Sequence, residues 1–261
     1  MSYNSARDEL FIADRGNRVV RAMRVRDNAG DLRDVYRAPH DTSPDLFSVC
    51  HMSDSDTLLV CSSENNKWWL VALSRNGSEW REAQRVPTDE CGMISCALSD
   101  SRVLIGYGGD SSTSPYMELF RVESGPRIAR VHRIHVPELY YSFSATCGSD
   151  TLVAMSYPKI ERFSPNGDNS VRVHRLRGDR LKELARIQLK KPVYLLWLAD
   201  RLLVDESNSV IELEVSDTRL ERRHELIATS ENICVTRLCA VNDGVAIFDA
   251  NSRDILHYSF A

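Results

Sequence analysis

The stretch YYSFSATCGSDTLVAM, at residues 140–155, shows the pattern that decides the fold. Two short runs of small, β-branched and aromatic residues, 140–147 and 151–155, lie on either side of a polar break that ends in Asp150. Runs of this length are too short for ordinary helices, and Gly, Ser and Asp between them are typical of a turn. We therefore interpret the stretch as two antiparallel strands joined by a tight hairpin.

The same hairpin pattern recurs along the chain at a nearly even spacing. The aspartates at the expected turns are separated by 46, 46, 50, 50 and 43 residues, and they are Asp8, Asp54, Asp100, Asp150, Asp200 and Asp243. An apolar run precedes each of the last five, and another apolar run follows it closely. Repetition at this period indicates an array of similar supersecondary units.

Hydrophobicity falls from the first strand to the fourth strand within each repeat. The hairpin strands are mostly apolar, the third segments alternate polar with apolar residues, as in 211–215, and the fourth segments are the most polar, as in 181–189. An apolar strand suits a position that is buried on both faces, whereas a charged strand suits a sheet edge. The segment 180–191 also contains good helix formers, but its place in the repeat favours a strand.

These features predict an all-β protein that forms a single β-propeller domain over residues 1–261, because radially arranged four-stranded sheets would show this gradient. Six blades with an irregular or incomplete closing blade fit the spacing best, and five blades are the alternative. The approximate repeats are 1–38, 46–87, 93–137, 140–191, 193–228 and 233–261. About 22 strands can be placed, roughly two fewer than six full blades need. We therefore expect an incomplete terminal blade or strands supplied by the flanking sequence of a longer protein.

One segment carries a resemblance to a known repeat. Residues 10–19, LFIADRGNRV, resemble the NHL-type repeat, in which a strand ends in Asp and a short Asn/Gly turn leads into the next strand. Weaker forms of the pattern occur at 203–210 and 247–251, whereas the Trp-Asp and Gly-His signatures of WD40 repeats are absent. The resemblance places the chain in the β-propeller superfamily, with NHL-like or WD40-like repeats, and implies no specific family.

Composition and charge narrow the classes of partner. The chain has 261 residues, a net charge of −4 and a pI near 6.0, so it has no overall electrostatic reason to bind nucleic acid or an anionic membrane. No apolar run approaches the roughly 18 to 20 residues that cross a bilayer. Seven cysteines without a Cys-x-x-Cys pair suit buried, reduced thiols. We therefore expect an intracellular protein, cytoplasmic or nuclear, with no membrane partner.

The sequence also lacks the common catalytic signatures. No nucleotide-binding loop, zinc-protease motif, nucleophile elbow or EF-hand loop occurs, which predicts a protein that is not an enzyme and needs no cofactor. In propeller enzymes of lactonase type, carboxylates and amides hold a divalent metal, and the corresponding carboxylates here would be Asp14, Asp205 and Asp249. Each can instead cap the turn that follows it, which is the interpretation we favour. We expect no metal site, and a metal-dependent lactonase-like hydrolase is the second alternative function.

Two long connections point to a function in binding. They run from about Gly106 to Tyr116 and from about Tyr157 to Asn169, and both should emerge on one face of the propeller. Long loops on a rigid scaffold concentrate recognition, and Tyr and Arg dominate interface hot spots. We therefore predict a non-catalytic scaffold that binds a protein or peptide, or belongs to a multi-subunit complex. The predicted contact residues are Tyr107, Tyr116, Tyr140, Tyr157, Lys159, Arg162 and Phe163. The alternative is that these rings pack the loops onto the blades.

A basic sector gives the first alternative function. Residues 118–191 contain 14 Lys and Arg against 8 Asp and Glu, a net charge of +6, which leaves −10 on the rest of the chain. Such a sector could hold RNA phosphates. The predicted RNA-binding residues are Arg130, Arg133, Arg172, Arg175 and Arg177. Solvated outer strands of a propeller would show a similar bias without binding RNA.

Overall fold

The structure is a computed structural model, and it describes residues 1–25, 32–38, 45–64, 67–89, 94–98, 101–107, 115–123, 125, 127–160, 166–198, 200–206, 209–216, 218–228, 235–242, 244–249 and 254–259. These residues form 23 β-strands and one short 3-10 helix, η1 (Ser53–Ser55). Across these ranges, no helix is long and apolar enough to cross a membrane. The described part of the chain is therefore almost entirely β-structure.

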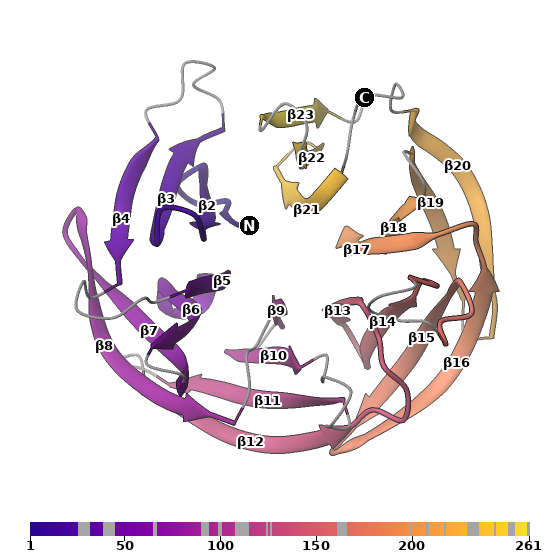
Figure 1. Cartoon of the computed structure of the whole chain (residues 1–261), viewed down its shortest axis with the longest axis horizontal. Coiled ribbons are helices and arrows are strands. Elements are labelled where there is room, and N and C mark those ends of the chain that lie inside the picture. The colour runs from indigo at the N-terminus through magenta and orange to yellow at the C-terminus, as the bar shows by residue number, and fades with distance from the viewer. Residues whose placement is uncertain are drawn as a thin grey trace. The chain divides into compact units, whose positions relative to one another are not determined.

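The strands form six small antiparallel sheets (Figure 1). The chain divides into two compact units. One unit consists of Met1–Tyr107 and Met117–Arg133, and the other of Gly108–Tyr116 and Ile134–Ala261. In every sheet, strands that follow one another along the chain are hydrogen-bonded neighbours. Each sheet is therefore a simple meander.

The first three sheets begin in the first unit. Their strands are β1 (Ser2–Asn4), β2 (Glu9–Asp14), β3 (Val19–Arg24) and β4 (Arg33–Arg37) in the first sheet, β5 (Asp45–Met52), β6 (Thr57–Glu64), β7 (Lys67–Asn76) and β8 (Glu79–Thr88) in the second, and β9 (Ile94–Ala97), β10 (Arg102–Tyr107), β11 (Tyr116–Glu123) and β12 (Arg127–His135) in the third. Each of these three sheets has four strands.

The other three sheets lie in the second unit. Their strands are β13 (Ser142–Cys147), β14 (Thr151–Tyr157), β15 (Ser170–Arg177) and β16 (Arg180–Gln188) in the fourth sheet, β17 (Pro192–Leu198), β18 (Arg201–Glu206), β19 (Ser209–Val215) and β20 (Leu220–Ala228) in the fifth, and β21 (Val235–Val241), β22 (Gly244–Asp249) and β23 (Ile255–Ser259) in the sixth. Among the described residues, the sixth sheet has three strands.

Six consecutive meander sheets of this size are the blades of a six-bladed β-propeller, which confirms the predicted fold class. The five-bladed alternative is wrong because the chain forms six sheets. The second sheet, for example, runs from β5 to β8 over residues 45–88, and the repeat predicted in this part of the chain is 46–87. The sheet with three strands among the described residues is the sixth, where the closing blade was expected to be irregular or incomplete.

Four of the predicted turn aspartates lie where the first strand of a sheet turns into the second. Asp8 precedes β2 in the left-handed conformation, with φ of 56°, and Asp54 lies in η1 between β5 and β6. Asp150 and Asp200 lie directly before β14 and β18. Short polar side chains tolerate such turns because they can hydrogen-bond locally. The other two predicted turn aspartates, Asp100 and Asp243, lie outside the described residues.

The fourth strands are polar, as predicted, and the segment 180–191 forms a strand rather than a helix. In β16, exposed and half-buried residues predominate, and Ala185 is the buried one. The strand pairs with β15 along its whole length and places Ile187 opposite Val171 and Leu181 opposite Leu176. Pairing with β15 thus outweighs the helix propensity of the segment.

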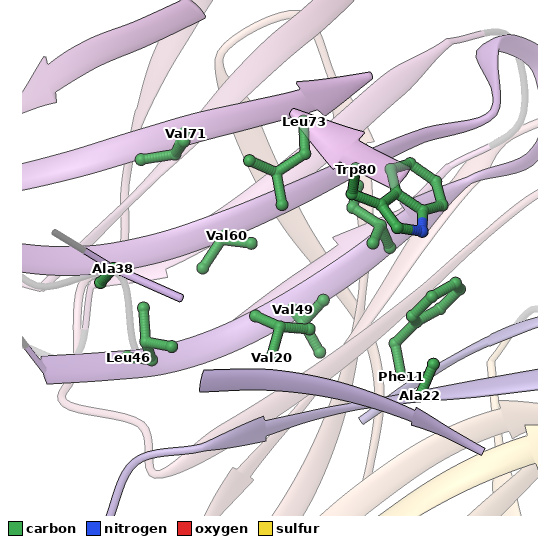
Figure 2. Packing of buried hydrophobic residues seen from close by; sticks show 11 residues of the cluster. Phe11, Val20, Ala22, Ala38, Leu46, Val49, Val60, Val71, Leu73 and Trp80 are labelled. Carbon is green, nitrogen blue, oxygen red and sulfur yellow. The ribbon is translucent and has the colours of Figure 1, made fainter. Parts of the chain in front are cut away.

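The core of the first unit forms where the first and second sheets pack face to face (Figure 2). Phe11 and Val20 from the first sheet contact Leu46 and Val60 from the second. The ring of Phe11 meets Trp80 edge-on, with ring centroids 5.7 Å apart. Complete burial of a side chain of this size stabilises the fold by about 1.5–3 kcal/mol. This cluster draws residues from β2 and β3 of the first sheet and from all four strands of the second.

Two further clusters form the core of the second unit. Val171 and Val173 of the fourth sheet pack with Trp197 and Leu202 of the fifth. On its other side, the fifth sheet packs against the sixth through a second cluster that includes Leu203, Val210, Val245 and Ile247. The fourth, fifth and sixth sheets thus form one continuous packed block. This block holds the candidate site.

Candidate partner-binding site

Four of the tyrosines predicted to contact a partner are buried. Tyr107 ends β10 and is 0% exposed, whereas Tyr116 and Tyr157, at the start of β11 and the end of β14, are 8% and 2% exposed. The hydroxyl of Tyr140 donates to the main-chain oxygen of Tyr116 at 3.2 Å, and its ring meets Phe143 edge-on. These rings pack the ends of the long connections onto the sheets. The exposed aromatic surface expected from the sequence is therefore not found at these four positions.

The remaining residues of the predicted contact surface belong to the second long connection. Lys159 is exposed, and its main-chain N–H donates to the side-chain oxygen of Asn169 at 2.7 Å, which fixes the start of the connection to its end. Arg162 and Phe163 lie outside the described residues. Lys159 is thus the one predicted contact residue that the described part of the chain presents on the surface.

Arg130 and Arg133, two of the predicted RNA-binding residues, lie on β12 and share one buried carboxylate on β11. The Nε atom of Arg130 lies 3.1 Å from Oε1 of Glu118, and Nη2 of Arg133 lies 2.9 Å from the same oxygen. Arg133 also forms an ion pair with Asp89. Because Glu118 is 0% exposed, the two guanidinium groups compensate a charge that would otherwise be costly to bury.

Arg172 on β15 is also held by carboxylates. Its Nη2 atom lies 2.9 Å from a carboxylate oxygen of both Glu138 and Asp168. Its guanidinium lies over the ring of Tyr157, with 4.1 Å between the guanidinium carbon and the ring centroid. Because Arg172 is buried, its guanidinium group links the end of β14, through Tyr157, to β15 and is not directed at a ligand.

The last two predicted RNA-binding residues share one aspartate. Nε of Arg175 lies 3.0 Å from Oδ2 of Asp150, and Nη2 of Arg177 lies 3.9 Å from Oδ1. All five predicted arginines therefore have a carboxylate beside them. Nearby carboxylates offset the positive charge on which phosphate binding depends.

The three aspartates considered as metal ligands occupy matching places in three sheets. Asp14 and Asp249 end β2 and β22, and Asp205 is the last residue but one of β18. Asp14 accepts hydrogen bonds from the main-chain and side-chain nitrogens of Asn17, at 3.1 and 2.8 Å, so it caps the turn that follows. In the described ranges, no group of three or more His, Cys, Asp and Glu residues is placed to hold a metal ion.

A different set of side chains forms a row on the first strands of the second unit. The tyrosine–arginine row consists of Tyr141, directly before β13, Tyr194 on β17 and Arg237 on β21. The rings of Tyr141 and Tyr194 meet edge-on with centroids 5.9 Å apart, and the guanidinium of Arg237 lies over the Tyr194 ring at 5.0 Å. All three side chains are half-buried, so each has a surface that a partner can contact.

Main-chain contacts fix the first two members of the row. The N–H of Tyr141 donates to the main-chain oxygen of Ser156 at 2.9 Å. The hydroxyl of the same serine donates to the main-chain oxygen of Val193, next to Tyr194, at 2.8 Å. Ser156 is 0% exposed, so it links β14 to β17 from inside the unit. The two tyrosines are therefore held by rigid strands, which lowers the entropy lost when they order against a partner.

A β-bulge places Tyr194 in the row. Pro192 pairs with Glu206 and Leu195 with Val204, so two residues of β17 oppose the single residue Asp205. The register of β21 also shifts, between Val235 and Arg237. Bulges re-aim side chains and occur often beside functional sites.

The electrostatics of the row favour binding over proton transfer. Burial raises the pKa of the Tyr194 hydroxyl, Arg237 lowers it, and a hydrogen bond with Tyr141 raises it further, with a net upward shift. Burial also raises the pKa of Asp205, opposite the bulge, to about 7, although Lys191 acts in the other direction. At neutral pH the Tyr194 hydroxyl is protonated, so the row presents a hydroxyl donor, two aromatic rings and a guanidinium. These groups can bind a carboxylate or a peptide group.

Sequence patterns gave no sign of this row. Tyr141 stands beside Tyr140, and alternation along an extended chain predicts opposite directions for the two rings but not which of them is buried. Tyr194 and Arg237 lie within first-strand runs that read as core. The signal that would have found them is the pair of bulges, which depends on strand pairing.

Comparison with known proteins identifies the fold and no family. No protein-family profile matches the chain, and no curated protein matches it. A chain from the crystal structure of the Mitotic Checkpoint Complex is similar over 99% of this chain and 88% of its own length, with 10% identity and a TM-score of 0.62. A protein from Lactobacillus plantarum is similar over 97% of this chain and 81% of its own, with 9% identity and a TM-score of 0.60.

Enzymes are found among the similar structures too. The PQQ-bound form of aldose sugar dehydrogenase from Streptomyces coelicolor is similar over 94% of this chain and 86% of its own length, with 9% identity and a TM-score of 0.61. Identities this low show a shared fold alone. Together with the six sheets, the similarities define the class of the protein as a β-propeller.

Proposed function

We propose that the protein is a non-catalytic interaction module that binds a protein or peptide through the tyrosine–arginine row. The observation that carries this proposal is the half-buried chain of contacts from Tyr141 through Tyr194 to Arg237. Tyr and Arg are enriched at interface hot spots because they combine large contact areas with hydrogen-bond donors. The three residues come from consecutive sheets, so one extended segment can contact all of them.

The chemistry of the row favours a partner segment that carries a carboxylate. The guanidinium of Arg237 is a charged donor, and hydrogen bonds between charged groups are stronger than neutral ones. The flanking rings add apolar contact surface. An acidic residue beside an apolar residue in the partner would use both parts of the row.

The raised pKa of Tyr194 supports a binding role over a catalytic one, since a hydroxyl with such a pKa is a poor base at neutral pH. A propeller chain within a multiprotein complex is among the similar structures, and a sugar dehydrogenase is another. The fold therefore serves both kinds of function. The proposal depends on the row and not on those similarities.

The experiment compares partner recovery across matched variants. Affinity purification from an extract of the source cells, with quantitative mass spectrometry, should recover a specific set of proteins with the wild type and about tenfold less of them with Tyr194→Ala or Arg237→Glu. Arg177→Ala is the control, because Arg177 is an exposed arginine of the same unit whose side chain is 74% exposed. Equal recovery of every protein by all variants would overturn the proposal.

Two further arms locate the binding surface. A photo-crosslinking residue at position 141 should capture the same partner, whereas one at Lys182, on the exposed outer strand β16, should not. Lys159→Glu tests the loop surface predicted from the sequence. Loss of the partner with Lys159→Glu alone would move the site from the row to that connection.

A further inference from the structure

The sixth sheet lacks the fourth strand that each of the other five sheets has, counting described residues only (Figure 1). Its last strand, β23, pairs with β22 and occupies the place that β19 occupies in the fifth sheet. In the fifth sheet, β20 covers the far side of β19. The far side of β23 is therefore the sheet edge in the described part of the chain.

The register identifies equivalent residues in the two sheets. Ile211 and Leu213 on β19 pair with the fourth and second residues of β18. Leu256 and Tyr258 on β23 pair with the fourth and second residues of β22. Both pairs of side chains face the preceding sheet, since the first pair packs with the fourth sheet and the second pair with the fifth. The two pairs are thus equivalent in sequence position and in the face they occupy.

Their exposure differs. Ile211 and Leu213 are both 0% exposed, whereas Leu256 and Tyr258 are half-buried. In the fourth sheet, Arg172 and His174 lie on the face of β15 away from the fifth sheet, since Val171 and Val173 pack toward it, and they are 6% and 5% exposed. The fourth and fifth sheets have a covering fourth strand, and the sixth has none within the described ranges. The missing strand therefore accounts for the apolar surface left at β23.

The outer strands β16 and β20 are protected as edges, whereas β23 is not. β16 and β20, with the sequences RLKELARIQ and LERRHELIA, carry several charges each, and both have a register shift against their neighbours. β23, with the sequence ILHYS, has no Lys, Arg, Asp, Glu or Pro, and it pairs with β22 without a register shift. Natural edge strands are usually blocked by charges, Pro or bulges. β23 has the composition of an inner strand.

Gly244 holds β23 close to β22. It pairs with Ser259, and a Cβ atom at this position would overlap the main-chain carbonyl of Tyr258. The close approach keeps the main chain of β23 next to that of β22, and the two strands pair without interruption from Gly244 to Phe248. A strand of this kind can pair with a further strand through its main chain.

We propose that β23 accepts a strand from a partner protein, which adds antiparallel to it as the fourth strand of the sixth sheet. The internal fourth strands define the chemistry of this partner strand. β16 and β20 are each nine residues long, with apolar residues near both ends and charged residues between. Ile187 opposes Val171, and Ile227 opposes Val210, so the partner should place an apolar residue opposite Ile255, which occupies the corresponding position.

The neighbouring sheet defines the charge of the partner strand. β16 contacts β20, so the outer strands of adjacent sheets lie next to each other, and the added strand would lie next to β20. The middle of β20 is exposed and carries both signs of charge, in Glu221, Arg222, Arg223 and Glu225. A partner strand with acidic and basic residues in its middle fits this surface, as β16 fits it on the other side.

The test uses a synthetic peptide with the sequence of β16, RLKELARIQ, as the probe. Two control peptides carry N-methyl groups on alternate main-chain nitrogens, one on each set. The unmodified peptide should slow amide hydrogen exchange in 255–259 by about tenfold. One methylated peptide should protect as well as the unmodified one, and the other should give no protection, because only one set of N–H groups faces β23.

The results of this experiment distinguish a partner strand from a second copy of the chain at the edge of β23. No protection by the unmodified peptide, or equal effects of the two methylated peptides, would overturn strand addition. Protection that appears without peptide as protein concentration rises, with a dimer in sedimentation, would assign the edge to a second copy of the chain and also overturn the proposal. The double variant Tyr194→Ala/Arg237→Glu should bind the peptide like the wild type, so this test and the test of the tyrosine–arginine row can fail independently.

Discussion

Two arginines of the second unit stack on tyrosine rings, yet their surroundings differ. Arg172 lies 4.1 Å from the Tyr157 ring, is buried and has carboxylate oxygens of Glu138 and Asp168 at 2.9 Å. Arg237 lies 5.0 Å from the Tyr194 ring, is half-buried and belongs to the first strand of its sheet. The comparison teaches that the stacked pair alone does not define a role. Burial and the two neighbouring carboxylates make the first pair a structural clamp, whereas the second pair is half-buried, and we propose that it binds a partner.

The largest expected effect is on the first pair. Arg172→Ala should lower the free energy of unfolding by about 3 kcal/mol, because it removes a buried guanidinium together with its ion pairs and its contact with Tyr157. Chemical denaturation of wild type and variant measures the difference. Arg237→Ala, as the matched variant, should cost less than about 1 kcal/mol. Equal losses from the two substitutions would remove the distinction between clamp and binding row.

The second effect concerns pH and Asp205, opposite the bulge that carries Tyr194. Burial raises the pKa of this carboxyl to about 7, above its value in the unfolded chain, so the folded state holds a proton that the unfolded state releases. The contribution is complete below the unfolded pKa and is lost as the pH rises towards about 7. Its size is about 1.4 kcal/mol for each unit of pKa shift.

Asp205→Asn keeps the shape of the side chain and removes this titration. Denaturation of the variant between pH 5 and pH 8 should show a smaller fall in stability than denaturation of the wild type. Asp150→Asn is a control, because Asp150 belongs to an ion pair near the surface. Parallel pH profiles for wild type and Asp205→Asn would show that the carboxyl is ionised throughout the range.

The third effect is on binding. Tyr194→Phe retains the ring over which Arg237 lies and removes the hydroxyl that hydrogen-bonds with Tyr141. Partner recovery should fall several-fold, by less than the roughly tenfold loss expected for Tyr194→Ala, and stability should change by less than about 1 kcal/mol. A larger loss of binding with Phe than with Ala would show that the ring does not contact the partner.

The smallest effect is expected for Arg177, whose side chain is 74% exposed and 3.9 Å from Asp150. Arg177→Ala should change stability by less than about 0.5 kcal/mol, because exposed ion pairs contribute little. Fluorescence anisotropy with single-stranded RNA at two salt concentrations should show no difference from the wild type. Salt-dependent binding that this substitution weakens would restore the RNA alternative for the basic sector.

Much of the fold follows from local sequence signals. Asp150 between two apolar runs marks a hairpin, and the charged segment 181–189 marks an outer strand, because turns and edges depend on nearby residues. The sequence predicted a shortage of strands in the closing blade, and the sixth sheet has three strands among the described residues. Because these signals recur along the chain, a strand or turn that is misassigned in one repeat can be recognised by comparison with the other repeats.

The site depends on packing between distant segments and was not predictable in this way. Tyr140 and Tyr141 are adjacent, yet Tyr140 turns inward to Phe143 while Tyr141 meets Tyr194, which lies 53 residues further along the sequence. Composition likewise indicated a basic sector, but the partners of Arg133 come from two other strands or connections, at Asp89 and Glu118. Charge counts contain no information on such pairing.

Gly244 adds a constraint of a different kind. Its missing side chain is the space that the carbonyl of Tyr258 occupies, so even a single methyl group there would push the last strand away from the sheet. A substitution at Gly244 would therefore displace β23 while leaving its own residues, 255–259, unchanged. We expect Gly244→Ala to weaken the addition of a partner strand to β23, although the substituted residue is itself buried.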